Sequence, residues 1–110
     1  MKNIGRVLFI AVTLSLPASG ATIASAAGDA KSFFSSAEGK FGNGDYQGAI
    51  TDDNKAIELD PSFVPAYINR AAEKLDVGDK QGVIGDLLAA ARRGHEGAQQ
   101  WLSNNGVSGW

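Results

Sequence analysis

The stretch Gly44–Pro61, GDYQGAITDDNKAIELDP, decides the fold because its first half returns further along the chain. The pattern GDxQGxIxD at positions 44–52 reappears at positions 78–86. A period of this size is typical of helical repeats, in which each unit is a helix pair that buries its apolar face against a copy of itself. The sequence therefore predicts an array of stacked helix pairs.

Apolar residues recur at spacings of three and four along most of the chain, which predicts amphipathic helices. The expected helices run from Ser32 to about Asn43, from Tyr46 to about Leu59, from Phe63 or Val64 up to Gly78, from Asp79 up to Gly94, and from about Glu96 to Ser103. Asp45 and Asp79 stand where N-caps are needed, and glycines or Pro61 end the preceding helices. No segment has the alternation and composition of a strand, so the fold class is predicted to be all-helical.

The N-terminal segment 1–26 has the features of a signal peptide. Lys2 and Arg6 precede the short, mostly apolar run Val7–Leu16, and Ala24-Ser25-Ala26 supplies small residues at a cleavage site. This pattern predicts cleavage after Ala26 and export to the periplasm or the extracellular space. A membrane span needs roughly 17–25 apolar residues, so no span is expected after cleavage.

Charge and cysteine content limit the partners of the exported chain. Loss of Lys2 and Arg6 takes the basic side chains from 10 to 8 against 12 acidic ones, and the formal charge from −2 to −4. An acidic domain does not favour a nucleic-acid partner, because phosphate binding needs a basic face. The chain has no cysteine, so its stability has to come from packing and not from disulfides.

The period and the residue pattern together resemble the tetratricopeptide repeat. In the first unit, 30–63, the matching residues are Phe33, Ala37, Gly44, Asp45, Tyr46, Ala49, Ala56 and Pro61. In the second unit, 64–97, they are Tyr67, Ala71, Gly78, Asp79, Val83 and Ala90. The second unit departs from the pattern at His95, which replaces the closing proline, and its ending GHEGAQQWL is similar to Sel1-like repeats. Asp53 replaces the usual aromatic of the first unit, which suggests a loosely filled space or an acid turned to solvent.

The resemblance implies a short tetratricopeptide-type α-solenoid of two helix-turn-helix repeats and a C-terminal capping helix. The expected organisation is a signal peptide (1–26), a lead-in (27–31), a helical domain (32–103, its capping helix at about 96–103) and a flexible tail (104–110). Trp101 and Leu102 are expected to cover the end of the fourth helix. The first helix has no such cover, which leaves self-association through Phe33 or Phe34 open.

No residue pattern indicates catalysis or a cofactor. His95 is the single histidine and lacks the second histidine that a zinc-binding helix would supply, so a turn residue is the favoured interpretation. Adjacent Asp52 and Asp53 diverge around a helix, which favours a solvated face. Neither a phosphate-binding loop nor a nucleophile elbow is present. We therefore expect no enzyme, no metal and no cofactor.

The remaining expectation is binding of a protein partner. In the family, the first helices of the repeats line a groove that takes an extended peptide or a partner helix. The groove residues implied by the resemblance are Lys31, Phe34, Ser35, Glu38, Phe41, Ile68, Asn69, Ala72, Leu75 and Asp76. The expected function is an exported adaptor or assembly factor, and the alternative is a self-associating structural subunit that has no separate client.

Overall fold

The structure is a computed structural model that describes the backbone of residues 16–110 and the side chains of residues 28–110. These residues form helices α2 (Leu16–Gly42), α3 (Tyr46–Leu59), α4 (Val64–Asp76), α5 (Lys80–Arg92) and α6 (Glu96–Asn104), and no strand. The prediction of an all-helical fold is confirmed for this part of the chain. The signal peptide predicted at 1–26 falls mostly outside the described residues and stays a prediction.

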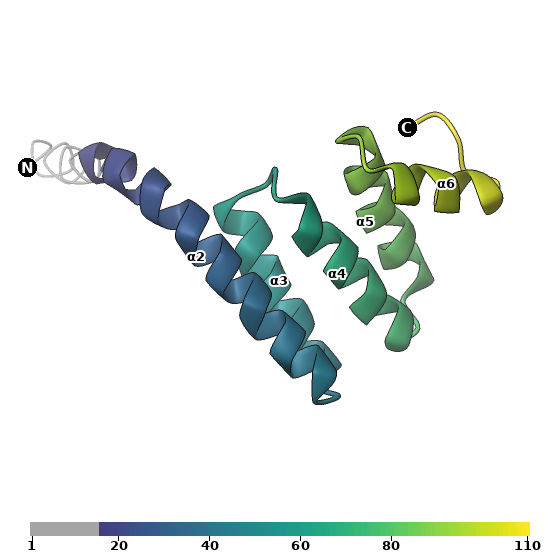
Figure 1. Cartoon of the computed structure of the whole chain (residues 1–110), viewed down its shortest axis with the longest axis horizontal. Helices are drawn as coiled ribbons and strands as arrows, with labels where there is room; N and C mark the ends of the chain where they lie inside the picture. Colours follow the sequence, from purple (N-terminus) through teal and green to yellow (C-terminus); the bar gives the residue numbers. More distant parts are fainter. Residues whose placement is uncertain (1–15) are drawn as a thin grey trace, which may run out of the picture.

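Consecutive helices pack against one another in chain order (Figure 1). α2 packs on α3, α3 on α4, α4 on α5 and α5 on α6, and α2 also touches α4. The short connections reverse the chain at each step from α2 to α5, while the N-terminal part of α2 projects beyond its neighbours. The helices therefore form pairs, with α3 joining the first pair to the second.

The recurring pattern of the sequence builds the same turn twice. Gly44 and Gly78 have φ of +83° and +82°, a left-handed conformation that glycine adopts without strain. The next residue then caps a helix, because Asp45 Oδ1 accepts from Gly48 N and Asp79 Oδ1 accepts from Gly82 N, both at 3.0 Å. A Cβ on either donor glycine would collide with the capping carboxylate. Both predicted caps are confirmed, and they explain why GDxxG recurs.

Helix α2 begins at Leu16, well before the predicted start at Ser32. The sequence favoured an interruption at Pro17 and Gly20. Pro17, however, is the second residue of α2, where a missing N–H and a fixed φ are tolerated. The alanine-rich residues that follow have high helix propensity, so the segment expected to be a lead-in (27–31) is helical.

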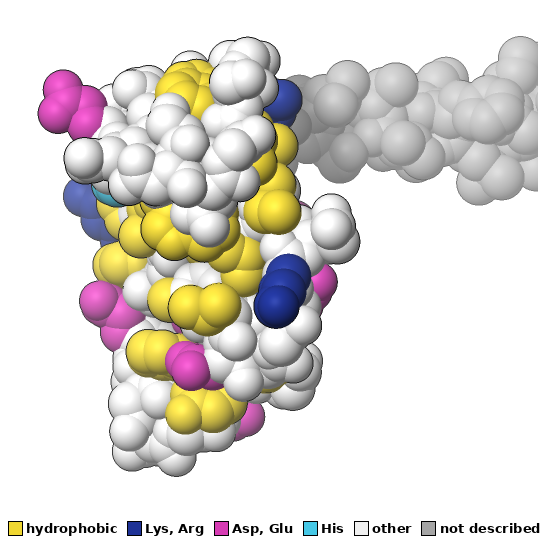
Figure 2. Space-filling model, turned by 90° about the vertical axis from the view of Figure 1, so that its right-hand side faces the viewer, with side chains coloured by type: hydrophobic (Ala, Val, Ile, Leu, Met, Phe, Trp, Pro, Cys, Tyr) yellow, Lys and Arg dark blue, Asp and Glu magenta, His cyan; other side chains and the backbone are white. Residues whose placement is uncertain are grey.

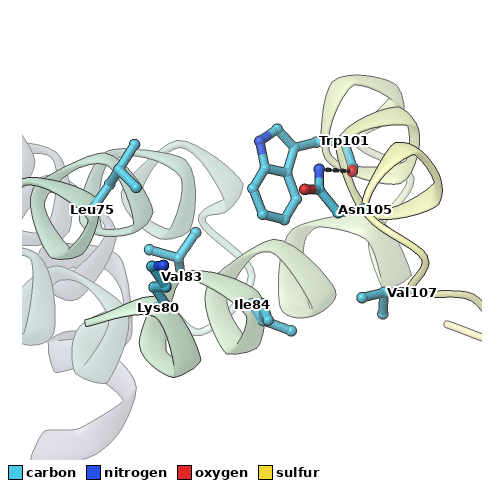
Figure 3. A pocket seen from close by; sticks show the side chains of 7 residues that line it. All are labelled: Leu75, Lys80, Val83, Ile84, Trp101, Asn105 and Val107. Atoms are coloured by element: carbon cyan, nitrogen blue, oxygen red, sulfur yellow. Dashed lines mark hydrogen bonds between the residues drawn. The ribbon is translucent and has the colours of Figure 1, made fainter. Parts of the chain in front are cut away.

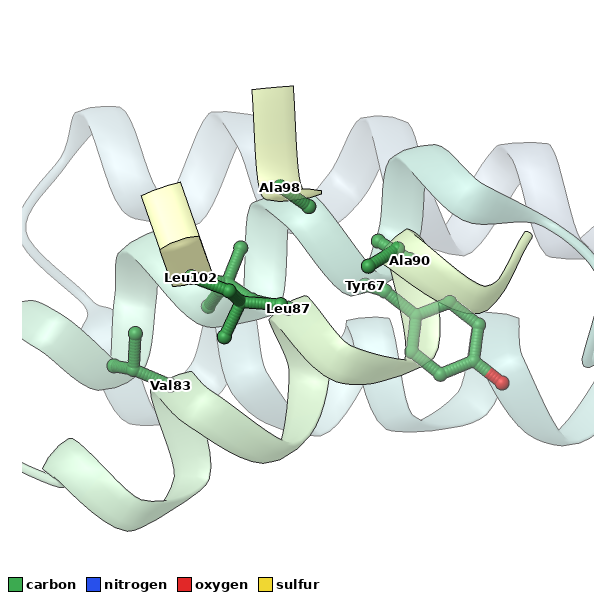
Figure 4. Close-up of a cluster of buried hydrophobic side chains, with 8 residues drawn as sticks. Tyr67, Val83, Leu87, Ala90, Ala98 and Leu102 are labelled. Carbon is green, nitrogen blue, oxygen red and sulfur yellow. The ribbon is translucent and has the colours of Figure 1, made fainter. Parts of the chain in front are cut away.

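The core consists of two groups of buried side chains. The larger group joins α4, α5 and α6, and Figure 4 shows the side chains of these helices converging; it comprises Tyr67, Ala71, Val83, Leu87, Ala90, Ala91, Ala98 and Leu102. The smaller group joins α2, α3 and α4 through fully buried Ala30, Ala56 and Ala66. Alanine at these positions lets helix axes approach closely, so the pattern of small residues sets the spacing of the helices.

The C-terminal tail contacts this core. Val107 and Trp110 are partly buried against the larger group, and Val107 N donates to Leu102 O at 2.8 Å. The sequence offered no period that could place these two side chains, and the flexibility expected at 104–110 stays a prediction. Among the described helices, none has the length and apolar character needed to cross a membrane.

The same substitution at two glycines is expected to change stability in opposite directions. Gly78→Ala should lower the free energy of unfolding by about 1–2 kcal/mol, because an L-residue is strained at φ +82°. Gly85→Ala should raise it by about 0.5–1 kcal/mol, because Gly85 lies inside α5 with open space around a Cβ. Urea denaturation followed by circular dichroism measures both. Equal signs would contradict the turn geometry.

Candidate partner-binding groove

A hollow of about 310 Å³ opens on the surface between the end of α4, the start of α5 and α6. Figure 3 shows the side chains that line it coming from these three helices and from the tail; they are Leu75, Lys80, Val83, Ile84, Trp101, Asn105 and Val107. We call this hollow the α4–α6 groove. Five of its seven lining side chains are hydrophobic, so it suits an apolar group.

Two large hydrophobic side chains of the groove lining are exposed. Leu75 lies in the last turn of α4 and is 60% exposed, and Trp101 lies on α6 and is 39% exposed. Asn105 Nδ2 donates to Trp101 O at 2.7 Å, which ties the residue after α6 to its last turn. Large apolar side chains at this exposure lose solvent contact when a partner covers them.

The charge around the groove is low. Lys80 is the one charged side chain among the lining residues, and no carboxylate of the described chain lies within ion-pair distance of it. Figure 2 views the end of the molecule that carries α5 and α6, and hydrophobic side chains gather there in a broken band. Acidic side chains border the band at its lower part. This end therefore offers several apolar side chains close together, with few charges among them.

The ten groove residues predicted from the resemblance differ in their exposure, and their role stays a prediction. Six of them are exposed: Lys31, Ser35, Glu38, Ala72, Leu75 and Asp76. The other four are partly buried: Phe34, Phe41, Ile68 and Asn69. Leu75 alone of the ten lines the α4–α6 groove.

The partly buried aromatics among them take part in packing. Phe34 makes an edge-to-face contact with Phe63, with ring centroids 5.3 Å apart, and Phe41 lies 5.4 Å from Tyr46. Phe33 and Phe34 also pack against the smaller buried group. Aromatic rings in this arrangement contribute about 0.5–1.5 kcal/mol beyond their buried area. The side chains considered for self-association thus serve partly to hold α2 in place.

The other six residues of the α4–α6 groove were missed by the sequence analysis. Trp101 was expected to cover the end of α5 together with Leu102, but only Leu102 is fully buried. Adjacent residues on a short helix point about 100° apart, so one of the two had to face away from the core. That geometry was the signal for an exposed tryptophan.

His95 has a structural role at the start of α6. Its Nδ1 accepts from Ala98 N at 3.0 Å, so the imidazole is the N-cap of the helix. This agrees with the interpretation of His95 as a turn residue. Among the described residues, no group of three or more histidine or acidic side chains is arranged to hold a metal ion.

The prediction that Asp52 and Asp53 lie on a solvated face is wrong. Asp52 is 7% exposed and Asp53 is fully buried. Asp52 pairs with Lys40 Nζ at 2.9 Å and accepts from Ser36 Oγ at 2.5 Å. Burial acts to raise the pKa of Asp52, but these two partners hold it below its ordinary value.

The counterpart of Asp52 in the second unit, Asp86, is tied in the same way. Arg70 donates to both of its oxygens, at 2.9 and 2.6 Å, and Lys74 Nζ lies 3.1 Å away. Arg70 and Lys74 occupy the positions in the second unit that Ser36 and Lys40 occupy in the first. Each helix pair therefore carries a carboxylate on its second helix that is held by two residues of its first.

Asp53 and Glu73 form a buried acid pair between α3 and α4. Both residues are fully buried, and within the described part of the chain none of their four carboxylate oxygens has a hydrogen-bond partner, nor has the nearby Nδ2 of Asn69. Burial raises the pKa of Asp53 to about 6, and burial together with the neighbouring Asp53 raises the pKa of Glu73 to about 9. The alternative of an acid turned to solvent at Asp53 is therefore wrong.

Comparisons of this chain with protein-family models, with curated proteins and with solved structures found no significant match.

Substitution of two leucines is expected to distinguish a surface residue of the groove from a core residue by the loss of stability. Leu75→Ala should lower the free energy of unfolding by at most about 1 kcal/mol, because more than half of its side chain is already in water. Leu102→Ala should lower it by about 2–5 kcal/mol, because it leaves a cavity at a fully buried position. Chemical denaturation measures both. A large loss at Leu75 would show that it belongs to the core.

Proposed function

We propose that the chain is a protein-interaction module of tetratricopeptide type, exported after cleavage at Ala26, that binds a peptide or a partner helix. The α4–α6 groove supports this proposal, because it exposes Leu75 and Trp101 beside a hydrophobic floor. Leu75 is also a groove residue that the resemblance implies. The groove would act as a rigid surface, so that binding orders little of the protein itself.

The proposal that the helix pairs are solenoid repeats is supported by contacts that recur at the period of the sequence. Three features of the first unit have a counterpart at the matching positions of the second. They are the turn, the aspartate cap and the ion pair between a lysine of the first helix and an aspartate of the second helix. In such an array α6 takes the place of the first helix of a third unit, as the capping helix. The groove then lies between two successive first helices, α4 and α6.

A binding function also fits the chemistry of the lining better than catalysis does. The lining residues contain one lysine, one amide and five hydrophobic side chains. Such a set can hold an apolar side chain and orient it through a few polar contacts. We therefore propose a non-enzymatic adaptor or assembly role, with the partner's apolar side chain inserted between Leu75 and Trp101.

Capture of a partner from an envelope extract is expected to depend on Leu75. The immobilised chain should retain a protein that the Leu75→Ser variant loses by tenfold or more, since the substitution removes an apolar wall of the groove. Val77→Ser is the matched control, because Val77 is 38% exposed on the same surface region and does not line the groove. Circular dichroism checks that both variants remain helical.

Equal retention by the Leu75→Ser variant and the parent would contradict the proposed groove. Recovery of the chain itself as the one retained protein would instead favour the self-associating structural subunit.

A further inference from the structure

The contact between α3 and α4 contains a feature that binding at the groove does not use. Asp53 from the middle of α3 and Glu73 from the last turns of α4 are fully buried at this contact. Two ionised carboxylates have no proton to share, so their four oxygens stay without a hydrogen-bond partner among the described residues. A single proton on either carboxyl would convert the contact into a hydrogen bond. The site is therefore built to favour a bound proton.

The arginine nearest the pair is committed to other partners. The charge of Arg70 on α4 acts to lower the pKa of both acids. Its guanidinium, however, is already hydrogen-bonded to Asp86 of α5 and to Asn54 of α3.

The nearby lysines are engaged as well. Lys74 of α4 pairs with Asp86, and Lys40 of α2 pairs with Asp52. The remaining acids, Asp52 and Asp86, act to keep the two carboxyls protonated. Within the described part of the chain, Arg70 is the cation that acts to lower the pKa of both acids, and it is held by Asp86 and Asn54.

The repeat pattern indicates that the fold does not require these acids. The residue of the second unit that corresponds to Asp53 is Leu87, which lies in the larger core group. A hydrophobic contact is therefore compatible with this position in the helix pair. An acid at 53, opposite a second acid at 73, replaces apolar packing by a contact whose strength depends on protonation.

We propose that Asp53 and Glu73 form a proton-binding site that sets how firmly the α2–α3 pair is held against α4 and α5. Proton loss places two like charges in the contact between α3 and α4, and this contact then loosens. Because Glu73 and Leu75 lie on the same end of α4, loosening also changes the support beneath the α4–α6 groove. The site would adjust the module to the pH of an exterior compartment.

The direction of the pH effect follows from the raised pKa values. In the unfolded chain the two acids titrate at their ordinary values of 3.8 and 4.5, whereas in the folded chain they titrate at about 6 and about 9. The folded protein therefore holds protons that the unfolded chain has released. The contribution of the pair is complete in acid and is lost as the pH rises through 6 and then 9.

The test measures folding of the full chain by urea denaturation between pH 5 and pH 9.5. The equilibrium constant for folding should fall by up to about tenfold per pH unit between pH 6 and pH 9, the slope that one proton produces. Glu73→Gln should remove this fall, because glutamine keeps the shape and carries no charge, and should make the protein more stable than the parent at pH 9. Glu58→Gln, an exposed acid of α3, should follow the parent.

Amide hydrogen exchange locates the effect. Between pH 6 and pH 9, after correction for the intrinsic exchange rate, protection should fall more steeply in α3 and α4 of the parent than in α5 and α6. If Glu73→Gln does not fold, Asp53→Asn is measured in its place, and it should reduce the slope between pH 6 and pH 9, because it removes the neighbouring charge and leaves Glu73 buried. A parent profile that is flat, a Glu73→Gln profile parallel to the parent, or restoration of stability at pH 9 by Ca²⁺ would each overturn the proton site.

Discussion

The contact between α3 and α4 is the constraint on which the rest of the structure depends. It joins the α2–α3 pair to the α4–α5 pair, and the two groups of buried side chains meet there through Ile57, which packs against both. It includes the fully buried small residues Ala56 and Ala66, and Asp53 and Glu73 are buried in the same contact. A charge in a buried contact destabilises it unless a partner compensates the charge.

This arrangement links the interior of the protein to its proposed binding surface. α4 takes part in both groups of buried side chains, carries Arg70 and Glu73 into the polar part of the contact with α3, and has Leu75 in its last turn on the groove. The opposite wall, Trp101, is held by α6, whose position depends on Leu102 and on the cap made by His95. One wall of the groove therefore belongs to α4, which contacts α3 through the acid pair. The other wall belongs to α6, which packs against the larger group of buried side chains.

Much of the local structure could be predicted because it is determined by neighbours in the sequence. The turns at Gly44 and Gly78 and the caps at Asp45 and Asp79 involve residues close together along the chain, and the pattern GDxxG specifies them. The start of α2 was misplaced because Pro17 was interpreted as a break and not as a residue of a first turn.

Features that join distant segments could not be predicted in the same way. The burial of Asp53 depends on α4 bringing Glu73 to it, and the spacing within α3 carries no information about that. The groove draws its lining from α4, α5, α6 and the tail, of which the resemblance pointed only to Leu75. Asn69, one of the groove residues that the resemblance implies, has its Nδ2 buried near the acid pair, without a partner among the described residues.

Carbon-13 NMR of the side-chain carboxyls can detect whether the proposed proton site between α3 and α4 is occupied at neutral pH. The carboxyl carbon of Glu73 should titrate near pH 9 and that of Asp53 near pH 6, whereas exposed Glu38 and Glu58 serve as internal references. Titration of Glu73 together with these exposed glutamates would contradict the account, because it would show that no proton is held in the contact.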